Sequence, residues 1–114
     1  VNTYLTERKT MEPVTLNELL MLMREPGLVI LDVRPGLEYR QGHIAGARSM
    51  PIDELQQRLH ELPHDQEIVA YCRGAYCVFA DEAVELLTAH GYQARRMQQG
   101  YPEWHLAQLP TETE

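Results

Sequence analysis

Two short apolar runs constrain this chain more than any other feature. The segments 28–33 and 67–72 are each six residues of mostly aliphatic and β-branched sequence. Such runs are too short for a buried helix and are typical of strands that are covered on both faces. Strands of that kind occur in parallel sheets between layers of helices. The two runs therefore predict an α/β domain with a mainly parallel central sheet flanked by helices.

Helical patterns lie before, between and after these runs. Thr15 and Glu18 fit a capping box, and apolar residues follow at helical spacing, which predicts a helix over 15–24 that Pro26 ends. A second helical repeat covers 80–87. The other expected elements are a short helix over 37–40, a strand end over 49–51, a helix capped by Asp53, a strand over 93–97 and a terminal helix after Gly100.

The composition is that of one ordinary globular domain. The 114 residues are 44% hydrophobic and 24% charged, enough for one core and too few for two. Seventeen acidic and ten basic residues give a formal charge of −7, which repels nucleic-acid phosphates. No apolar run reaches the roughly 18 residues of a membrane span, and no secretory segment is visible. We therefore expect a cytoplasmic domain that contacts neither membrane nor DNA directly.

The ends of the chain differ from its centre. The chain begins with Val1, and residues 1–12 are polar with little apolar periodicity. We expect this stretch to be a linker or tail from an upstream region. The folded domain is expected over 13–110, with a short C-terminal tail over 111–114.

Cys72 and Cys77 are the only cysteines, and they define the predicted site. Cys72 ends the second apolar strand, and ligands of open α/β sheets bind beyond the carboxyl ends of strands. The loop from Cys72 runs directly into a helix, whose N-terminus and backbone N–H groups favour a thiolate. Arg73 adds a positive charge, and Gly74 is expected to supply the positive φ of a tight loop. The alternative is that Cys72 is a buried cysteine acting as a small hydrophobe.

Three segments together resemble the rhodanese domain, a single-domain sulfurtransferase fold with three layers. They are LDVRPGLEYRQGHIAGARSMPIDEL (31–55), YCRGAYCVFADEAVELL (71–87) and GYPEWHLAQLP (100–110). The resemblance covers the chain from about Pro13, and the joint order and spacing of the segments make it specific. The form YCRGAYC behind a polar linker is further similar to the rhodanese domain that follows an ArsR-type winged-helix domain in bacterial transcription regulators.

The resemblance implies a nucleophilic cysteine that takes sulfane sulfur from thiosulfate, a polysulfide or a persulfide. This cysteine holds the sulfur as a persulfide and passes it to a thiol or cyanide, with no metal or organic cofactor. Cys72 matches it. The residues that match the persulfide-binding loop are Arg73, Gly74, Ala75, Tyr76, Cys77 and Val78.

The loop departs from the family at Cys77 and Val78. Many active rhodaneses have arginine or another polar residue at the first position and serine or threonine at the second, so we expect weaker thiosulfate turnover here. Cys77 offers a second thiol that can attack a Cys72 persulfide, releasing sulfide and leaving a disulfide, or can join Cys72 through a bridging sulfur. We therefore hypothesise a redox or persulfide switch. A direct bond needs Cα atoms within about 7 Å, which the sequence leaves open.

Other polar and aromatic residues have supporting interpretations. Asp32 and Arg34 either line the cleft or, as we favour, form a partly buried ion pair that holds the loop. The resemblance to the family implies a structural role for His43, with its ring hydrogen-bonded to nearby backbone. Trp104 is expected in the core, and Tyr76 either shapes donor access or is a plain loop residue. The spacing of His60, His64, His90 and His105 builds no metal site, so we expect them at the surface.

Three functions compete at this point. The first is a sulfurtransferase that uses Cys72. The second is a sensory module of a transcription regulator, in which the cysteine pair changes state with little turnover and any DNA contact is made through an upstream winged-helix domain. The third is a cysteine-dependent phosphatase or arsenate reductase of a related fold. That class needs an arginine six residues after the cysteine to grip an oxyanion, and Val78 stands there instead.

Overall fold

The computed structural model describes residues 12–74 and 76–114 of the chain. The helices in these ranges are α2 (Leu16–Leu22), α3 (Gly36–Gln41), α4 (Ile52–Arg58), α5 (Val78–Ala89) and α6 (Tyr101–Leu106), with a 3₁₀ turn η1 (Leu59–Glu61) after α4. The strands are β1 (Leu28–Asp32), β2 (His43–Ile44), β3 (Arg48–Ser49), β4 (Glu67–Tyr71), β5 (Gln93–Arg96) and β6 (Thr111–Glu112). In the described ranges, every helix is too short or too polar to cross a membrane.

The central sheet is parallel, as the two apolar runs predict. Its four strands follow the order β3-β1-β4-β5 in the part of the chain that the structure describes. β1 and β4 pair residue for residue, so that Asp32 lies opposite Tyr71 at the carboxyl edge. Cys72 directly follows Tyr71, and the register therefore brings it to the same edge as Asp32.

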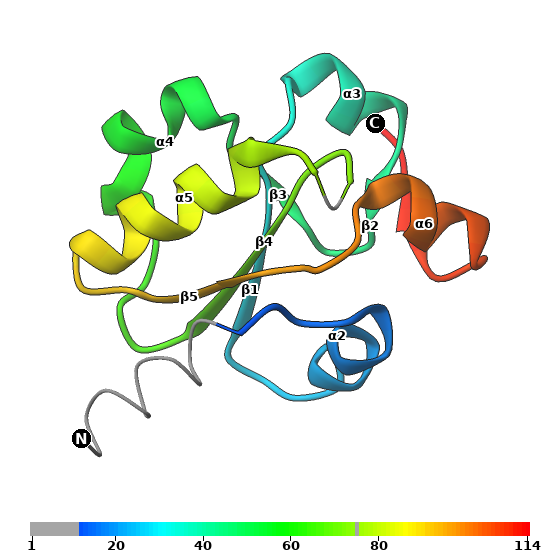
Figure 1. Cartoon of the computed structure of the whole chain (residues 1–114), viewed down its shortest axis with the longest axis horizontal. Coiled ribbons are helices and arrows are strands. Elements are labelled where there is room, and N and C mark those ends of the chain that lie inside the picture. The colour runs from blue at the N-terminus through cyan, green and yellow to red at the C-terminus, as the bar shows by residue number, and fades with distance from the viewer. Residues whose placement is uncertain (1–11, 75) are drawn as a thin grey trace.

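Helices cover both faces of this sheet (Figure 1). Alternate strand residues point to opposite sides, so Val29 and Leu31 join the core under α4 and α5. Ile30 belongs to the core on the other face, with Leu19 of α2 and Trp104 of α6. The α/β fold with a mainly parallel sheet between helical layers is confirmed.

Several local expectations differ from the structure. The helix expected over 15–24 covers only Leu16–Leu22. Asp53 does not cap α4, because Pro51 occupies the N-cap position without a side-chain hydrogen bond and Asp53 lies in the first turn. The last residues, expected to be a tail, include β6, which pairs antiparallel with β2 through backbone groups. The expected linker over 1–12 lies, except for Glu12, outside the described residues.

A buried polar network ties the strand ends together. The side chains of Asp32 and Arg34 form an ion pair with an Oδ2 to Nη2 distance of 2.6 Å, and the residues are 0% and 4% exposed. The Tyr71 hydroxyl donates to Asp32 Oδ2 at 2.7 Å and accepts from the Ile44 N–H at 3.1 Å. Burial, reinforced by the Asp32 charge, raises the pKa of Tyr71, so its hydroxyl stays protonated as a donor. The predicted ion pair is therefore part of a larger network.

Arg34 carries this network to the segment that precedes β2 and to α6. Its Nη2 also donates to the Gly42 carbonyl at 2.6 Å, and its guanidinium lies 4.5 Å from the centre of the Tyr101 ring. Burial alone would lower the pKa of Arg34, but the hydrogen bond and charge of Asp32 outweigh it and raise the pKa. Arg34 is therefore a permanent buried cation that is matched by one carboxylate.

We predict that replacing Arg34 by methionine lowers the free energy of unfolding by about 3–5 kcal/mol, because the Asp32 charge would remain buried without its partner. Urea unfolding measures this change. The matched control is Arg24→Met at an exposed position, where a change below about 0.5 kcal/mol is expected. Equal losses in the two variants would contradict a structural role for the pair.

Candidate functional site

Cys72 lies in the first turn beyond β4 and is 0% exposed. Its carbonyl accepts a hydrogen bond from the Tyr101 N–H at 3.0 Å, which joins the cysteine loop to the start of α6. Its side chain belongs to the apolar core beneath α4 and α5. The position beyond the strand end agrees with the sequence prediction. The complete burial agrees with the alternative, in which Cys72 acts as a small hydrophobe.

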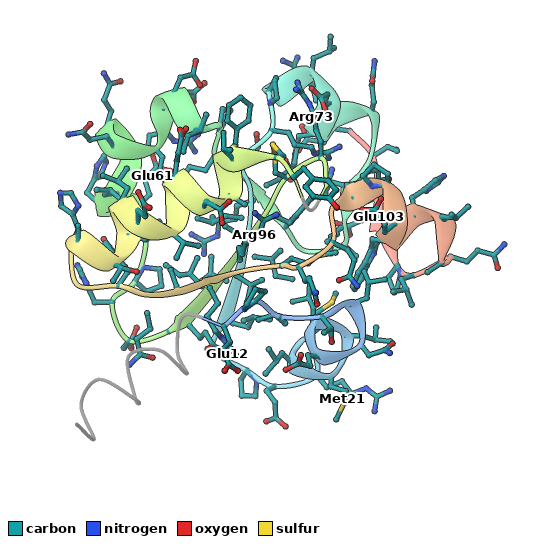
Figure 2. The ribbon with its side chains drawn as sticks, viewed as in Figure 1. Glu12, Met21, Glu61, Arg73, Arg96 and Glu103 are labelled. Atoms are coloured by element: carbon teal, nitrogen blue, oxygen red, sulfur yellow. A yellow bond between two sulfur atoms is a disulfide. The ribbon has the colours of Figure 1, made fainter. Side chains whose placement is uncertain are left out.

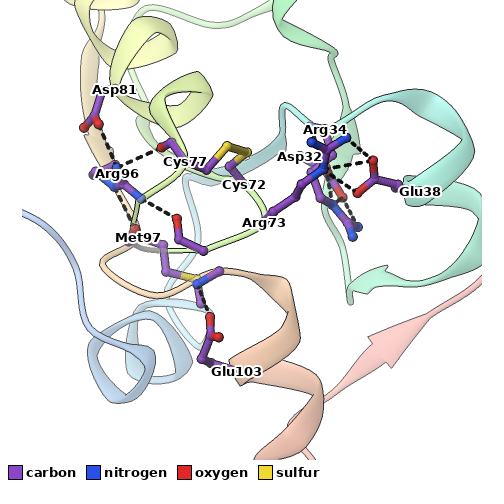
Figure 3. The surroundings of a disulfide bond; sticks show 12 residues. Asp32, Arg34, Glu38, Cys72, Arg73, Cys77, Asp81, Arg96, Met97 and Glu103 are labelled. Carbon is purple, nitrogen blue, oxygen red and sulfur yellow. Dashed lines mark hydrogen bonds and ion pairs between the residues drawn. A yellow bond between two sulfur atoms is a disulfide. The ribbon is translucent and has the colours of Figure 1, made fainter.

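A disulfide joins Cys72 to Cys77 across the loop (Figure 3). The two Cα atoms lie 6.3 Å apart, which is within the usual range for a disulfide. The geometric question that the sequence left open is thus answered: the loop permits a direct bond. Cys77 is the N-cap residue of the twelve-residue helix α5 and, unlike Cys72, is only partly buried.

The loop backbone is folded back on itself in this disulfide-bonded form. The N–H of Cys77 donates to the carbonyl of Gly74 at 3.2 Å. That amide is therefore turned to the loop instead of to the centre of an anion-binding semicircle. Ala75, which sequence analysis included in the loop, lies outside the described residues.

Arg73 points away from the disulfide, toward α3 (Figure 3). Its Nε donates to both carboxylate oxygens of Glu38, at 3.0 and 3.1 Å. The hydrogen bond from Arg73 lowers the pKa of Glu38, so both partners are charged at neutral pH. The positive charge of Arg73, which the sequence placed beside Cys72, is thus paired with the carboxylate of Glu38.

Arg96, which the sequence did not single out, lies against the cysteine loop (Figure 2). It ends β5, is 8% exposed and donates from Nη2 to the carbonyl of Gly74 at 3.0 Å. Its Nη1 donates to the carbonyl of Cys77 at 3.3 Å and to the Asp81 carboxylate on α5 at 2.9 Å. One side chain therefore holds the loop on both sides of Ala75. The only signal in the sequence was an arginine at a strand's carboxyl end, where buried charges are uncommon.

Gly74 does not supply the positive φ that was expected of it, and the glycine that this region needs is Gly100, for a different reason. Gly74 is absent from the glycines with positive φ, and a Cβ atom added to it would meet no described heavy atom within 4 Å. A Cβ atom on Gly100, at the start of α6, would instead run into the backbone of Arg73 and Gly74. The close approach that needs glycine is therefore between α6 and the loop, which the local sequence of the loop cannot reveal.

The remaining candidate residues differ in their exposure. His43 is buried, and its Nδ1 lies 2.7 Å from the carbonyl of Tyr39, which agrees with the structural interpretation. Tyr76 is 100% exposed, and Val78 is more than half exposed at the first position of α5. Trp104 is buried in the core, as predicted. The other four histidines are exposed, and among residues 12–74 and 76–114 no three His, Cys, Asp or Glu side chains gather as a metal site.

A hollow of about 350 Å³ opens at the carboxyl edge of the sheet. Its walls are mainly apolar, with two carboxylates at one side. The lining residues are Val33, Pro35, Gly36, Pro51, Ile52, Asp53, Glu54 and Phe79. Ile52 and Phe79 also pack against the core cluster that contains Cys72, and Cys77 packs against the same cluster. The hollow therefore shares part of its lining with the core that holds Cys72, and its walls are apolar and acidic.

The comparisons with known proteins agree with this arrangement. The family model for the rhodanese-like domain matches residues 15–107. The HTH-type transcriptional regulator Rv0324 of Mycobacterium tuberculosis is 46% identical over 89% of this chain, which spans only 45% of that protein. A sulfurtransferase of Allochromatium vinosum is 33% identical over 65% of this chain and 59% of its own length. The solution structure of the rhodanese-like domain of Anabaena Alr3790 has a TM-score of 0.79 at 32% identity, covering 91% of this chain and 81% of that chain.

We predict opposite outcomes for alanine at the two glycines. Gly100→Ala should lower the free energy of unfolding by about 1–3 kcal/mol, because the new methyl group must displace backbone. Gly74→Ala should leave stability unchanged or raise it by about 0.4–1 kcal/mol, because its backbone accepts an L-residue and the space is open. Denaturant unfolding of both variants tests the pair. A larger loss at Gly74 would show that its backbone conformation matters after all.

We also predict that Arg96→Met loosens the cysteine loop. The carbonyls of Gly74 and Cys77 would lose a charged donor, at a cost of about 2–3 kcal/mol. Amide hydrogen exchange at Cys77 should become faster. The matched control is Arg95→Met, on the opposite side of the same strand, where only a partly exposed pair with Glu67 would be lost, a change below about 1 kcal/mol. Equal exchange rates at Cys77 in the two variants would contradict the holding role of Arg96.

Proposed function

The chain belongs to the rhodanese-like family, and we propose from this that it is a sulfurtransferase-type domain in which Cys72 forms a persulfide. The observation that carries the proposal is the placement of Cys72. It follows a central parallel strand, at the edge where ligands of such sheets bind, and its loop leads directly into α5. The sulfurtransferase of Allochromatium vinosum among its relatives agrees with this class of reaction.

The proposed reaction begins with the reduced cysteine pair. The Cys72 thiolate attacks the outer sulfur of the donor, and the sulfur–sulfur bond of the donor breaks. The electron pair leaves with the donor's remainder, which is sulfite from thiosulfate or a shorter sulfur chain from a polysulfide. The positive end of α5 and the loop amides stabilise the anionic persulfide, so the step needs no general base. A thiol or cyanide then takes the outer sulfur.

The charges of the site favour a polysulfide or persulfide over thiosulfate. Glu38 offsets the charge of Arg73, and Asp53 and Glu54 line the hollow described above. A thiosulfate dianion would meet these carboxylates, and the guanidinium groups of Arg73 and Arg96 are already paired with Glu38 and Asp81. A less highly charged sulfur chain also gains from the apolar walls. Val78 adds no hydrogen-bond donor from its side chain to the loop.

A second candidate function is a regulatory module with little turnover. Two observations favour it: the Cys72–Cys77 disulfide and the 46% identity to a transcriptional regulator. In this function, a Cys72 persulfide is attacked by Cys77, sulfide leaves, and the disulfide remains as the signal. The acidic chain described here would not touch DNA itself, and an upstream winged-helix domain would do so in the cytoplasm.

A single-turnover experiment distinguishes the two functions. The reduced chain is mixed with thiosulfate or with polysulfide, and mass spectrometry follows sulfur on each cysteine. We expect one sulfur atom on Cys72 in the unaltered chain and in Cys77→Ser, with polysulfide reacting faster than thiosulfate. Cys72→Ser should take up no sulfur at the loop.

The fate of that sulfur then decides between enzyme and sensor. Rapid transfer to added cyanide that survives Cys77→Ser supports the sulfurtransferase. Stoichiometric conversion to the disulfide without transfer, lost in Cys77→Ser, supports the regulatory module. If the Cys72→Ser variant took up sulfur on Cys77 as fast as the unaltered chain takes it up, Cys72 would be excluded as the nucleophile.

A further inference from the structure

The two sulfurs of the disulfide are unequally accessible. Cys72 is 0% exposed and its side chain belongs to the core under α4 and α5. Cys77 is only partly buried, and both of its chain neighbours in the described ranges, Tyr76 and Val78, are exposed. A nucleophile must approach a disulfide sulfur along the line of the bond that breaks, so access decides which sulfur it attacks. Of the two bonded residues, only Cys77 is partly exposed, so the approach is expected at its sulfur.

We propose that small thiolates open this disulfide at Cys77, which makes Cys77 the thiolation site of the oxidised domain. The thiolate RS⁻ bonds to the Cys77 sulfur, the bond between Cys77 and Cys72 breaks, and its electron pair leaves on Cys72. The products are a mixed disulfide, Cys77–S–S–R, and a Cys72 thiolate. No proton or further oxidant is needed, because the two oxidising equivalents pass from one disulfide to the other.

The site also suits Cys72 as the leaving group. Its sulfur is bonded to the N-cap residue of α5, so the departing thiolate lies at the positive end of a twelve-residue helix. The partial positive charge of the helix end stabilises the negative charge that forms on the departing sulfur. Arg96 meanwhile holds the carbonyls of Gly74 and Cys77, which keeps the loop in place as the bond opens.

Hydrosulfide is the smallest nucleophile of this class, and its product links the opening to the proposed function. Attack of HS⁻ on Cys77 gives Cys77–S–SH and the Cys72 thiolate. The Cys72 thiolate can then attack the outer sulfur, forming Cys72–S–SH and leaving a Cys77 thiolate. The oxidised domain would thus make its persulfide from sulfide, with the disulfide as the oxidant. This last step rests on the proposed function, whereas the opening at Cys77 does not.

Partial reduction of the oxidised 114-residue chain by glutathione tests the site of attack. Acid quenching protonates the thiolates and stops exchange, and a maleimide then labels the free thiols. Trypsin cuts after Arg73 and so separates the two cysteines into different peptides. We expect glutathione on Cys77 and maleimide on Cys72, with the Cys77 adduct in at least about tenfold excess. With hydrosulfide, the first extra sulfur should likewise appear on the Cys77 peptide, which Cys72 is then free to attack.

The same reaction in denaturant is the control, because unfolding exposes both sulfurs and should abolish the preference. Glutathione mainly on Cys72, equal adducts in the folded chain, or an unchanged preference in denaturant would each overturn the proposal. So would a folded chain that keeps two free thiols after treatment with diamide. The experiment contains no sulfane donor and starts from the oxidised chain, so its failure leaves persulfide formation by the reduced chain untouched.

Discussion

The buried charge of Asp32 is the interaction on which the frame of the site depends. Its carboxylate is surrounded by Arg34 and the Tyr71 hydroxyl at the carboxyl edge of the sheet. Arg34 extends the network to the Tyr101 ring, and the Tyr101 N–H holds the carbonyl of Cys72. A buried carboxylate tolerates few arrangements of its partners, because each unpaired group costs free energy. The ends of β1 and β4 and the start of α6 are thereby fixed around the cysteine.

Arg96 holds the same loop from the opposite side (Figure 3). The Asp32 network acts at the beginning of the loop, through Cys72, and Arg96 acts further along, through the carbonyls of Gly74 and Cys77. Because two separate anchors hold the backbone, we expect making or breaking the sulfur–sulfur bond to change chiefly the sulfurs and the nearby amides. We therefore expect the fold around the loop to persist in both oxidation states.

The sequence predicted the parts of this structure that local pattern controls. The apolar runs marked β1 and β4, the helical repeat marked α5, and the order of the motifs placed Cys72 at the sheet edge. The features that it could not predict depend on residues distant in the chain. Arg96 meets the loop only after β5 pairs with β4, Gly100 matters only because α6 packs on Gly74, and β6 exists only through its pairing with β2. The exposed fraction of Cys72 is likewise a property of the assembled core.

The burial of Cys72 bears on the choice between enzyme and sensor. A cysteine that turns over must meet its donor in every cycle, but in the disulfide-bonded form the Cys72 sulfur is closed off within the core and bonded to Cys77. Under the proposed function, oxidation would therefore stop sulfur transfer at the sulfur that we propose performs it. In the reduced form, Cys77 would no longer be bonded to that sulfur, which would leave it free to react with a donor. The two proposed functions would then differ in the oxidation state of one pair of cysteines, and the ratio of sulfide and thiols to oxidants around the domain would decide which of them operates.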